Sequence, residues 1–170
     1  MIICLLFCLD ATSQQTASPD EVMQLTLPKG TEKLTKQQFN NDFSKRFSKT
    51  FVSDYHHYVY KKNGLLVYYL NIAVPAKMKK SLESDKKMII SLFGQLKTTV
   101  VDTSKIITVN NIRFLIIKFH ENDDWYIRFS SDYDKGNKSI NGFIEYKKTD
   151  DAEVSQYLHD LLQSMHFKDN

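Results

Sequence analysis

The chain has 170 residues, of which 42% are hydrophobic and 25% charged, a balance typical of a globular protein that can bury one sizeable core. Its formal net charge is only +3, and acidic residues lie close to most of the paired lysines. The sequence therefore predicts one domain and excludes the strongly basic class of nucleic-acid-binding proteins.

The first residues, 1–13, have the pattern of a cleavable signal segment. Ile2 to Leu9 is almost purely apolar, and the small residues Ala11-Thr12-Ser13 follow, as a signal peptidase requires. We predict cleavage before Gln14. The segment lacks the usual basic start and is shorter than the about 20 apolar residues of a membrane-spanning helix, so we expect no stable membrane anchor. A short buried N-terminal helix is the alternative.

Both cysteines, Cys4 and Cys8, fall inside this segment. The mature chain would then have no disulfide, no thiolate metal site and no cysteine nucleophile. Lipidation is not expected either, because Ile3 and Phe7 stand where a modified cysteine needs a small residue before it.

A polar lead-in without periodicity covers residues 14–21, includes Ser18-Pro19, and is predicted to be disordered or loosely held. A single α+β domain is expected over residues 22–170. Its first element is a short strand from Val22 to Leu27, which the turn signal Pro28-Lys29-Gly30 closes.

A helix is predicted to begin at Thr35, because Thr35-x-x-Gln38 has the form of a capping box. Phe39, Phe43 and Phe47 follow at spacings of four, which places three rings on one helix face. Such a face indicates burial against the core. A cofactor-binding aromatic box is the less common alternative.

A β-hairpin is predicted next, with arms from Tyr55 to Lys61 and from Leu65 to Val74 around Asn63-Gly64. Asn-Gly suits the positive φ angles of a tight hairpin turn. The second arm is apolar on both faces, so we expect it in the middle of a layered structure. An amphipathic helix follows from Met78 to Leu96, with Gly94 near its end.

Four antiparallel strands are then predicted to form a meander, joined by short turns at Asn110-Asn111, Glu121 to Asp124, and Asp132 to Asn137. They run from Lys105 to Val109, Ile112 to His120, Trp125 to Ser131, and Lys138 to Lys147. The run Phe114-Leu115-Ile116-Ile117 lacks alternation, which again indicates a sheet covered on both faces. A last amphipathic helix is predicted from Asp151 to Met165, capped by Asp150.

This order of elements predicts an α+β fold: one antiparallel β-sheet of about six or seven strands with helices packed on both faces. The Asn141-Gly142-Phe143 strand, the capped last helix and the closing Leu162-Gln163-Ser164-Met165-His166-Phe167 make the chain resemble the PsbP and Mog1-like family, an α/β/α sandwich. The resemblance implies a largely non-enzymatic protein that binds partner proteins or assists larger complexes. It maps no functional residue onto this chain.

Two patterns suggest metal binding but are incomplete. Adjacent strand residues point to opposite faces, so only one of His56 and His57 could join Asp54 on an ion. The segment Asp132-x-Asp134-x-Gly136-Asn137 departs from a calcium loop, because its glycine is one position early and Phe143 replaces the bidentate glutamate. We therefore predict no metal site, no cofactor, and a plain hairpin turn at residues 132–137.

Glu121, Asp123 and Asp124 crowd one loop, where a hydrolase could use them as an acid/base pair. Three carboxylates in a polar loop are usually just solvated. The sequence contains no nucleophile elbow, phosphate-binding glycine loop or dinucleotide motif. No catalytic residue is therefore predicted.

Aromatic side chains on the hairpin and the meander, with one neighbouring histidine, are the best candidates for binding a ligand or a partner. Tyrosine and tryptophan combine apolar area with a polar handle, although cross-strand packing is the common alternative use. The candidate residues are Tyr55, His57, Tyr58, Tyr60, Tyr69, Trp125 and Tyr126.

The sequence as a whole favours an exported, non-enzymatic protein, periplasmic or secreted, that binds a protein partner or a ligand through the exposed sheet edge and hairpin loops. The alternative is a small-molecule or metal-binding module that uses the tyrosine- and histidine-rich hairpin. A hydrolase ranks third.

Overall fold

The computed structural model describes residues 15–17, 23–35, 37–38, 41, 59–63, 65–73 and 75–168. The predicted signal segment, the Phe39, Phe43 and Phe47 face, and the first part of the predicted strand from Tyr55 lie outside the described residues.

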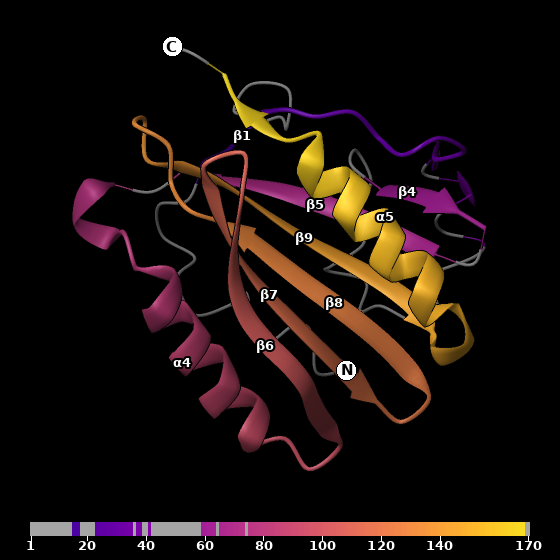
Figure 1. The fold of residues 1–170 in the computed structure, drawn as a ribbon. Helices are drawn as coiled ribbons and strands as arrows, with labels where there is room; N and C mark the ends of the chain where they lie inside the picture. The colour runs from indigo at the N-terminus through magenta and orange to yellow at the C-terminus, as the bar shows by residue number, and fades with distance from the viewer. Residues whose placement is uncertain are drawn as a thin grey trace.

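Eight of the ten described strands form one antiparallel sheet, in the order β3-β4-β5-β9-β8-β7-β6, with β1 paired to β5 (Figure 1). Their bounds are β1 Gln15–Ala17, β3 Glu32–Lys33, β4 Val59–Lys62, β5 Leu65–Ala73, β6 Thr99–Val109, β7 Ile112–Glu121, β8 Asp124–Ser131 and β9 Lys138–Lys147. The α+β class and the antiparallel sheet agree with the sequence-based prediction. The strand count is larger than the expected six or seven.

The early hairpin joins the meander through β5 and β9, which pair from Leu66↔Glu145 to Ala73↔Lys138. On its other edge, β5 pairs first with β4 and then, at Asn71–Ala73, with β1. Gln15–Ala17 lie in the segment that the sequence predicts to be a disordered or loosely held lead-in. In the structure these three residues pair with the sheet as β1.

Two helices pack on the sheet, α4 at Leu82–Gly94 and α5 at Asp151–Gln163. Phe114 and Ile116 of β7 join the hydrophobic core that contains the buried face of α5, whereas Leu115 and Ile117 join the core that contains α4. Both sides of β7 are therefore buried, as its lack of alternation predicted. Figure 1 shows α5 lying across the sheet and α4 alongside β6.

Asparagine is the residue that turns the chain between strands. Asn63, Asn110, Asn111, Asn122 and Asn137 all have φ between 50° and 62°. Asparagine tolerates this left-handed region better than most residues, because its short polar side chain can bond to the nearby backbone. The predicted turns at Asn63, at residues 110–111 and at residues 132–137 therefore occur where the sequence placed them.

Helix boundaries follow their capping chemistry. The predicted capping box is present, because Thr35 N donates to Gln38 Oε1 at 2.9 Å and Gln38 N donates to Thr35 Oγ1 at 3.2 Å. α4 begins later than predicted, because Ser81 Oγ caps it by accepting from Ser84 N at 3.2 Å. The prediction for Asp150 was wrong in one respect: it occupies the N-cap position of α5 but makes no side-chain cap bond.

These two caps should differ in their effect on stability. Ser81→Ala is expected to lower the free energy of unfolding by about 1 kcal/mol, because it removes the acceptor for a first-turn N–H group. Asp150→Ala should lower the free energy of unfolding by only about a few tenths of a kcal/mol, because it removes only the weak attraction between a carboxylate and a helix N-terminus. Urea denaturation of both variants measures the difference, and equal losses would contradict the assignment.

A second, two-stranded sheet holds the end of α5 in place. β2 (Met23–Gln24) pairs with β10 (His166–Phe167). Beside it, Ser164 Oγ accepts from Thr26 N at 3.0 Å and donates to Thr26 O at 2.8 Å. The N-terminal part of the domain therefore helps to set where α5 lies above the sheet. In the described part of the chain, no helix has the length and apolar character needed to cross a membrane.

Candidate ligand-binding groove

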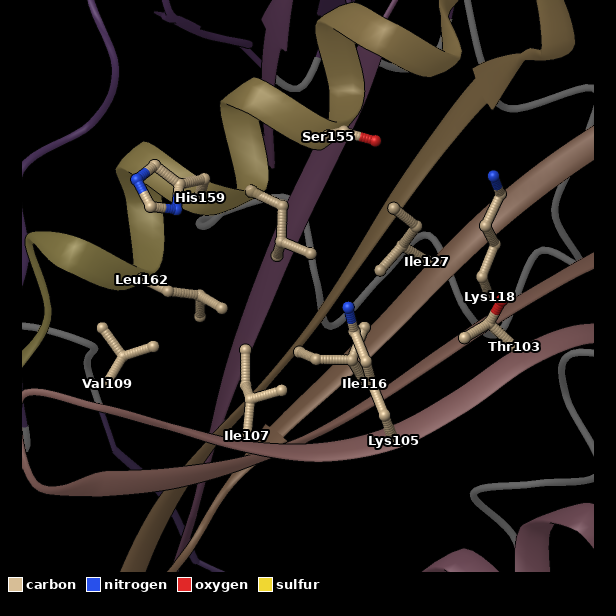
Figure 2. A pocket seen from close by; sticks show the side chains of 11 residues that line it. Thr103, Lys105, Ile107, Val109, Ile116, Lys118, Ile127, Ser155, His159 and Leu162 are labelled. Carbon is tan, nitrogen blue, oxygen red and sulfur yellow. The ribbon is translucent and has the colours of Figure 1, made fainter.

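A groove of about 330 Å³ runs between α5 and the face formed by β6, β7 and β8 (Figure 2). Figure 2 shows side chains from the helix and from the strands extending toward the space between them. The apolar lining consists of Ile107, Val109, Ile116, Ile127, Leu158 and Leu162, and the polar lining consists of Thr103, Lys105, Lys118, Ser155 and His159.

The two local periodicities explain how these residues come together. Thr103, Lys105, Ile107 and Val109 alternate along β6 and so share one face of the strand. On α5, Ser155 and His159 are four residues apart, as are Leu158 and Leu162, so each pair lies on one side of the helix. The groove is consequently polar toward Thr103 and mainly apolar toward Val109, where His159 lies near Leu162 (Figure 2).

Lys118 lies at the polar end of the groove and forms ion pairs with two acidic side chains. Its Nζ lies 2.5 Å from Asp151 Oδ1 and 3.7 Å from Asp102 Oδ2. Lys105 lies on the same side of the sheet, is exposed, and makes no ion pair with any residue that the structure describes. The charge of Lys118 is therefore largely offset within the protein, whereas that of Lys105 is available to a ligand.

Trp125 packs beside the charged end of the groove and is 8% exposed. Lys118 Nζ lies 5.2 Å and Lys148 Nζ 4.8 Å from the centre of a Trp125 ring, and the imidazole of His120 stacks on Trp125 at 4.5 Å. Cations within about 6 Å of an aromatic face are attracted by its quadrupole. Because Lys118 also lines the groove, the single tryptophan of the chain can report on events there.

Tyr146 and Asp151 complete this polar network. The Tyr146 hydroxyl donates to Asp151 Oδ1 at 3.0 Å. The hydrogen bond from Lys118, together with that from Tyr146, lowers the pKa of Asp151 despite partial burial. Burial, and then the hydrogen bond to the Asp151 carboxylate, raise the pKa of Tyr146 well above its usual value. Asp151 therefore contributes stability at neutral pH that is lost as the pH falls through its lowered pKa.

Tyr146→Phe is expected to reduce the loss of stability at alkaline pH. Above about pH 10, the unfolded chain releases the Tyr146 proton while the folded chain retains it, because its folded-state pKa is raised. The unfolded state then binds fewer protons than the folded state, so the free energy of unfolding falls as the pH rises. Phenylalanine has no proton to release. Urea denaturation across this range should give a shallower decline for the variant, and an unchanged slope would contradict the assignment.

The structure separates two of the predicted binding residues. Trp125 belongs to the core beneath α5, whereas Tyr126 belongs to the core beneath α4 and stacks on Phe119 at 5.1 Å. Tyr60 is half-buried and packs against the α5 core. Tyr55, His57 and Tyr58 lie outside the described residues, and only the backbone of Tyr69 is described, within β5. Their shared binding role stays a prediction.

The acidic candidates have local partners. Glu121 Oε1 accepts from Thr98 Oγ1 at 2.7 Å, and Asp124 Oδ1 lies 2.5 Å from Lys147 Nζ. Asp134 Oδ1 accepts from Lys138 N at 2.7 Å, a bond that closes the hairpin turn. In the described part of the chain, no three acidic, histidine or cysteine side chains gather as metal ligands would.

Sequence reasoning missed the groove residues Lys105, Lys118 and His159. A signal for them existed in the alternation of Lys105, Ile107 and Val109 along the predicted strand, and in the i, i+4 spacing of the last helix. That signal shows which residues share a face of the strand or of the helix, but it does not give the distance between the strand and the helix. A space between two elements becomes visible only when both have been placed.

Comparison with known proteins adds evidence on the fold. No protein-family model and no curated protein matches this sequence. Among solved structures, the chain is similar to cyanobacterial PsbP (CyanoP) from Synechocystis sp. PCC 6803, with a TM-score of 0.55 and 10% sequence identity over 95% of this chain and 96% of that chain. The chain has a PsbP-like fold. The resemblance inferred from the sequence is thereby confirmed at the level of architecture, and at this identity it transfers no site residue.

Proposed function

We propose that this chain is an exported, non-enzymatic binding protein whose binding site is the groove between α5 and the β6–β7–β8 face. The observation that carries the proposal is the composition of the groove. It offers a concave, mainly apolar groove of about 330 Å³ with a few polar groups, most of them toward the Thr103 end. Small-molecule sites commonly combine an apolar lining with a small number of placed polar groups.

The hydroxyl and imidazole at the groove do not form a nucleophile and base pair. Ser155 and His159 both line it, but Ser155 Oγ donates to Asp151 O at 2.7 Å, within its own helix. An activated serine would instead donate to the imidazole. This arrangement supports binding over hydrolysis. The resemblance to PsbP and Mog1-like proteins supports it further, because it implies a non-enzymatic protein that associates with partners.

Export is the second part of the proposal, with signal cleavage near Gln14. Cleavage at that position would leave the whole of β1, Gln15–Ala17, in the mature chain. N-terminal sequencing of protein recovered from an exported fraction tests this, with Gln14 expected as the first residue. An intact Met1 would overturn it.

The groove itself can be tested with a neutral apolar probe. Decanol should bind the full chain and change the fluorescence of Trp125. Ile107→Glu places a carboxylate among the apolar lining residues and should abolish the change, because an unpaired charge opposes apolar contact. Thr108→Glu is the matched control, since Thr108 is exposed and points to the other side of the same strand. If decanol fails to bind, or if both variants bind it like the parent, the groove is not the binding site.

A further inference from the structure

We propose that the groove binds a single-chain amphiphile with an anionic headgroup, a fatty-acid-like carboxylate. In this arrangement the carboxylate lies beside Lys105, and the alkyl chain runs over Ile107 and Val109 under Leu158 and Leu162. This inference rests on the proposed function, because it assigns a ligand class to the same groove.

The distribution of charge favours an anion at one end only. Lys118 is held by Asp151 and Asp102, whereas Lys105 has no acidic partner among the described residues. A carboxylate placed at Lys105 therefore gains an ion pair without displacing an existing one. A cationic headgroup would meet repulsion at the same place.

The apolar part of the groove limits the length of the chain it can take. Lys105 and Val109 are four residues apart on β6, which corresponds to about 13 Å along a strand. The volume of about 330 Å³ is at the small end of the range for ligand sites. These dimensions suit one alkyl chain of medium length better than the two chains of a membrane phospholipid.

The test compares three probes that share one alkyl chain, decanoate, decanol and decylammonium, each titrated against the full chain with Trp125 fluorescence as the readout. Decanoate is ionised at neutral pH and is expected to bind most tightly, decylammonium most weakly. Lys105→Gln should weaken decanoate binding about fivefold and leave decanol unchanged, as expected for the loss of one exposed ion pair. Lys105→Glu should reverse the order of affinity, so that decylammonium binds more tightly than decanoate.

Lys87→Gln is the matched control, because Lys87 is an exposed lysine on α4, which packs into the other core. It should change none of the affinities. Equal binding of decanoate and decanol, with no effect of Lys105→Gln, would overturn the carboxylate assignment and leave the groove as an apolar binding site. Failure of all three probes would overturn the proposed function as well.

Discussion

Replacing Gly142 with alanine is expected to lower the free energy of unfolding by about 3 kcal/mol, at the upper end of the cost of overpacking a core. A Cβ atom at Gly142 would lie 2.1 Å from Cζ and 2.5 Å from Cε1 of Phe129, far inside van der Waals contact. Phe129 stands directly opposite Gly142 in the β8–β9 pair and is fully buried. Its ring covers the glycine and has no open space into which it can move, so the two strands must shift instead.

Gly94→Ala is the matched control for this experiment. A Cβ atom at Gly94 would meet nothing within 4 Å, and the residue ends helix α4. Alanine is the better helix former, so this variant should be as stable as the parent or up to about 1 kcal/mol more stable. Thermal and urea denaturation of both variants provide the measurement. Parent-like stability of Gly142→Ala would show that the strands can separate more easily than the packing implies.

A double variant separates the ring clash from any effect on the backbone. If the clash with the ring is the cause, combining Gly142→Ala with Phe129→Leu should cost less than the sum of the two single changes, because the smaller side chain makes room for the Cβ atom. If the stability losses of the two single variants simply add, the loss caused by Gly142→Ala arises from the backbone and not from the contact with the ring.

Leu161→Ala is the second change with a large expected effect, a loss of about 3 kcal/mol in the free energy of unfolding. Leu161 is fully buried in the core between α5 and the sheet, together with Tyr157 and Phe129. Truncation removes apolar contacts and leaves a cavity that the paired strands beneath it cannot fill. Because this core holds α5 on the sheet, we expect the groove to loosen as well.

Leu158 offers a matched comparison one turn away on the same helix. It is only partly buried and forms part of the groove wall. Leu158→Ala should therefore cost about 1 kcal/mol or less in stability, but it should weaken decanol binding. Urea denaturation and probe titration of the two variants distinguish the roles. Equal stability losses would contradict the view that Leu161 anchors the helix while Leu158 mainly shapes the groove.

Predictions from the sequence were most accurate where local chemistry decides the structure. The capping box at Thr35 and the left-handed turns at Asn63 and Asn110 depend on a few neighbouring residues, and the structure contains them. β6 shows where this reasoning fell short. Its strand was predicted only from Lys105, whereas pairing with β7 extends it back to Thr99 through an irregularity between Val101 and Thr103.

The predicted binding residues show the same division between local and tertiary information. The alternation rule that separates His56 from His57 also separates Trp125 from Tyr126, and the structure places these two in different cores. That separation follows from strand geometry alone. The network of Trp125 with Lys118 and His120 joins β7 to β8 in a register that sequence patterns leave open.

The sequence by itself determined the class of fold, the turns, the helices and the apolar faces, because φ preferences, caps and periodicity act over a few residues. Only the tertiary structure decided that β5 pairs with β9, that β1 joins the sheet, and that α5 leaves a groove above β6. The physical reason is that long-range pairing depends on the summed fit of many side chains distant in the chain. The groove, which is our candidate site, is a product of that fit and has no counterpart in any single segment.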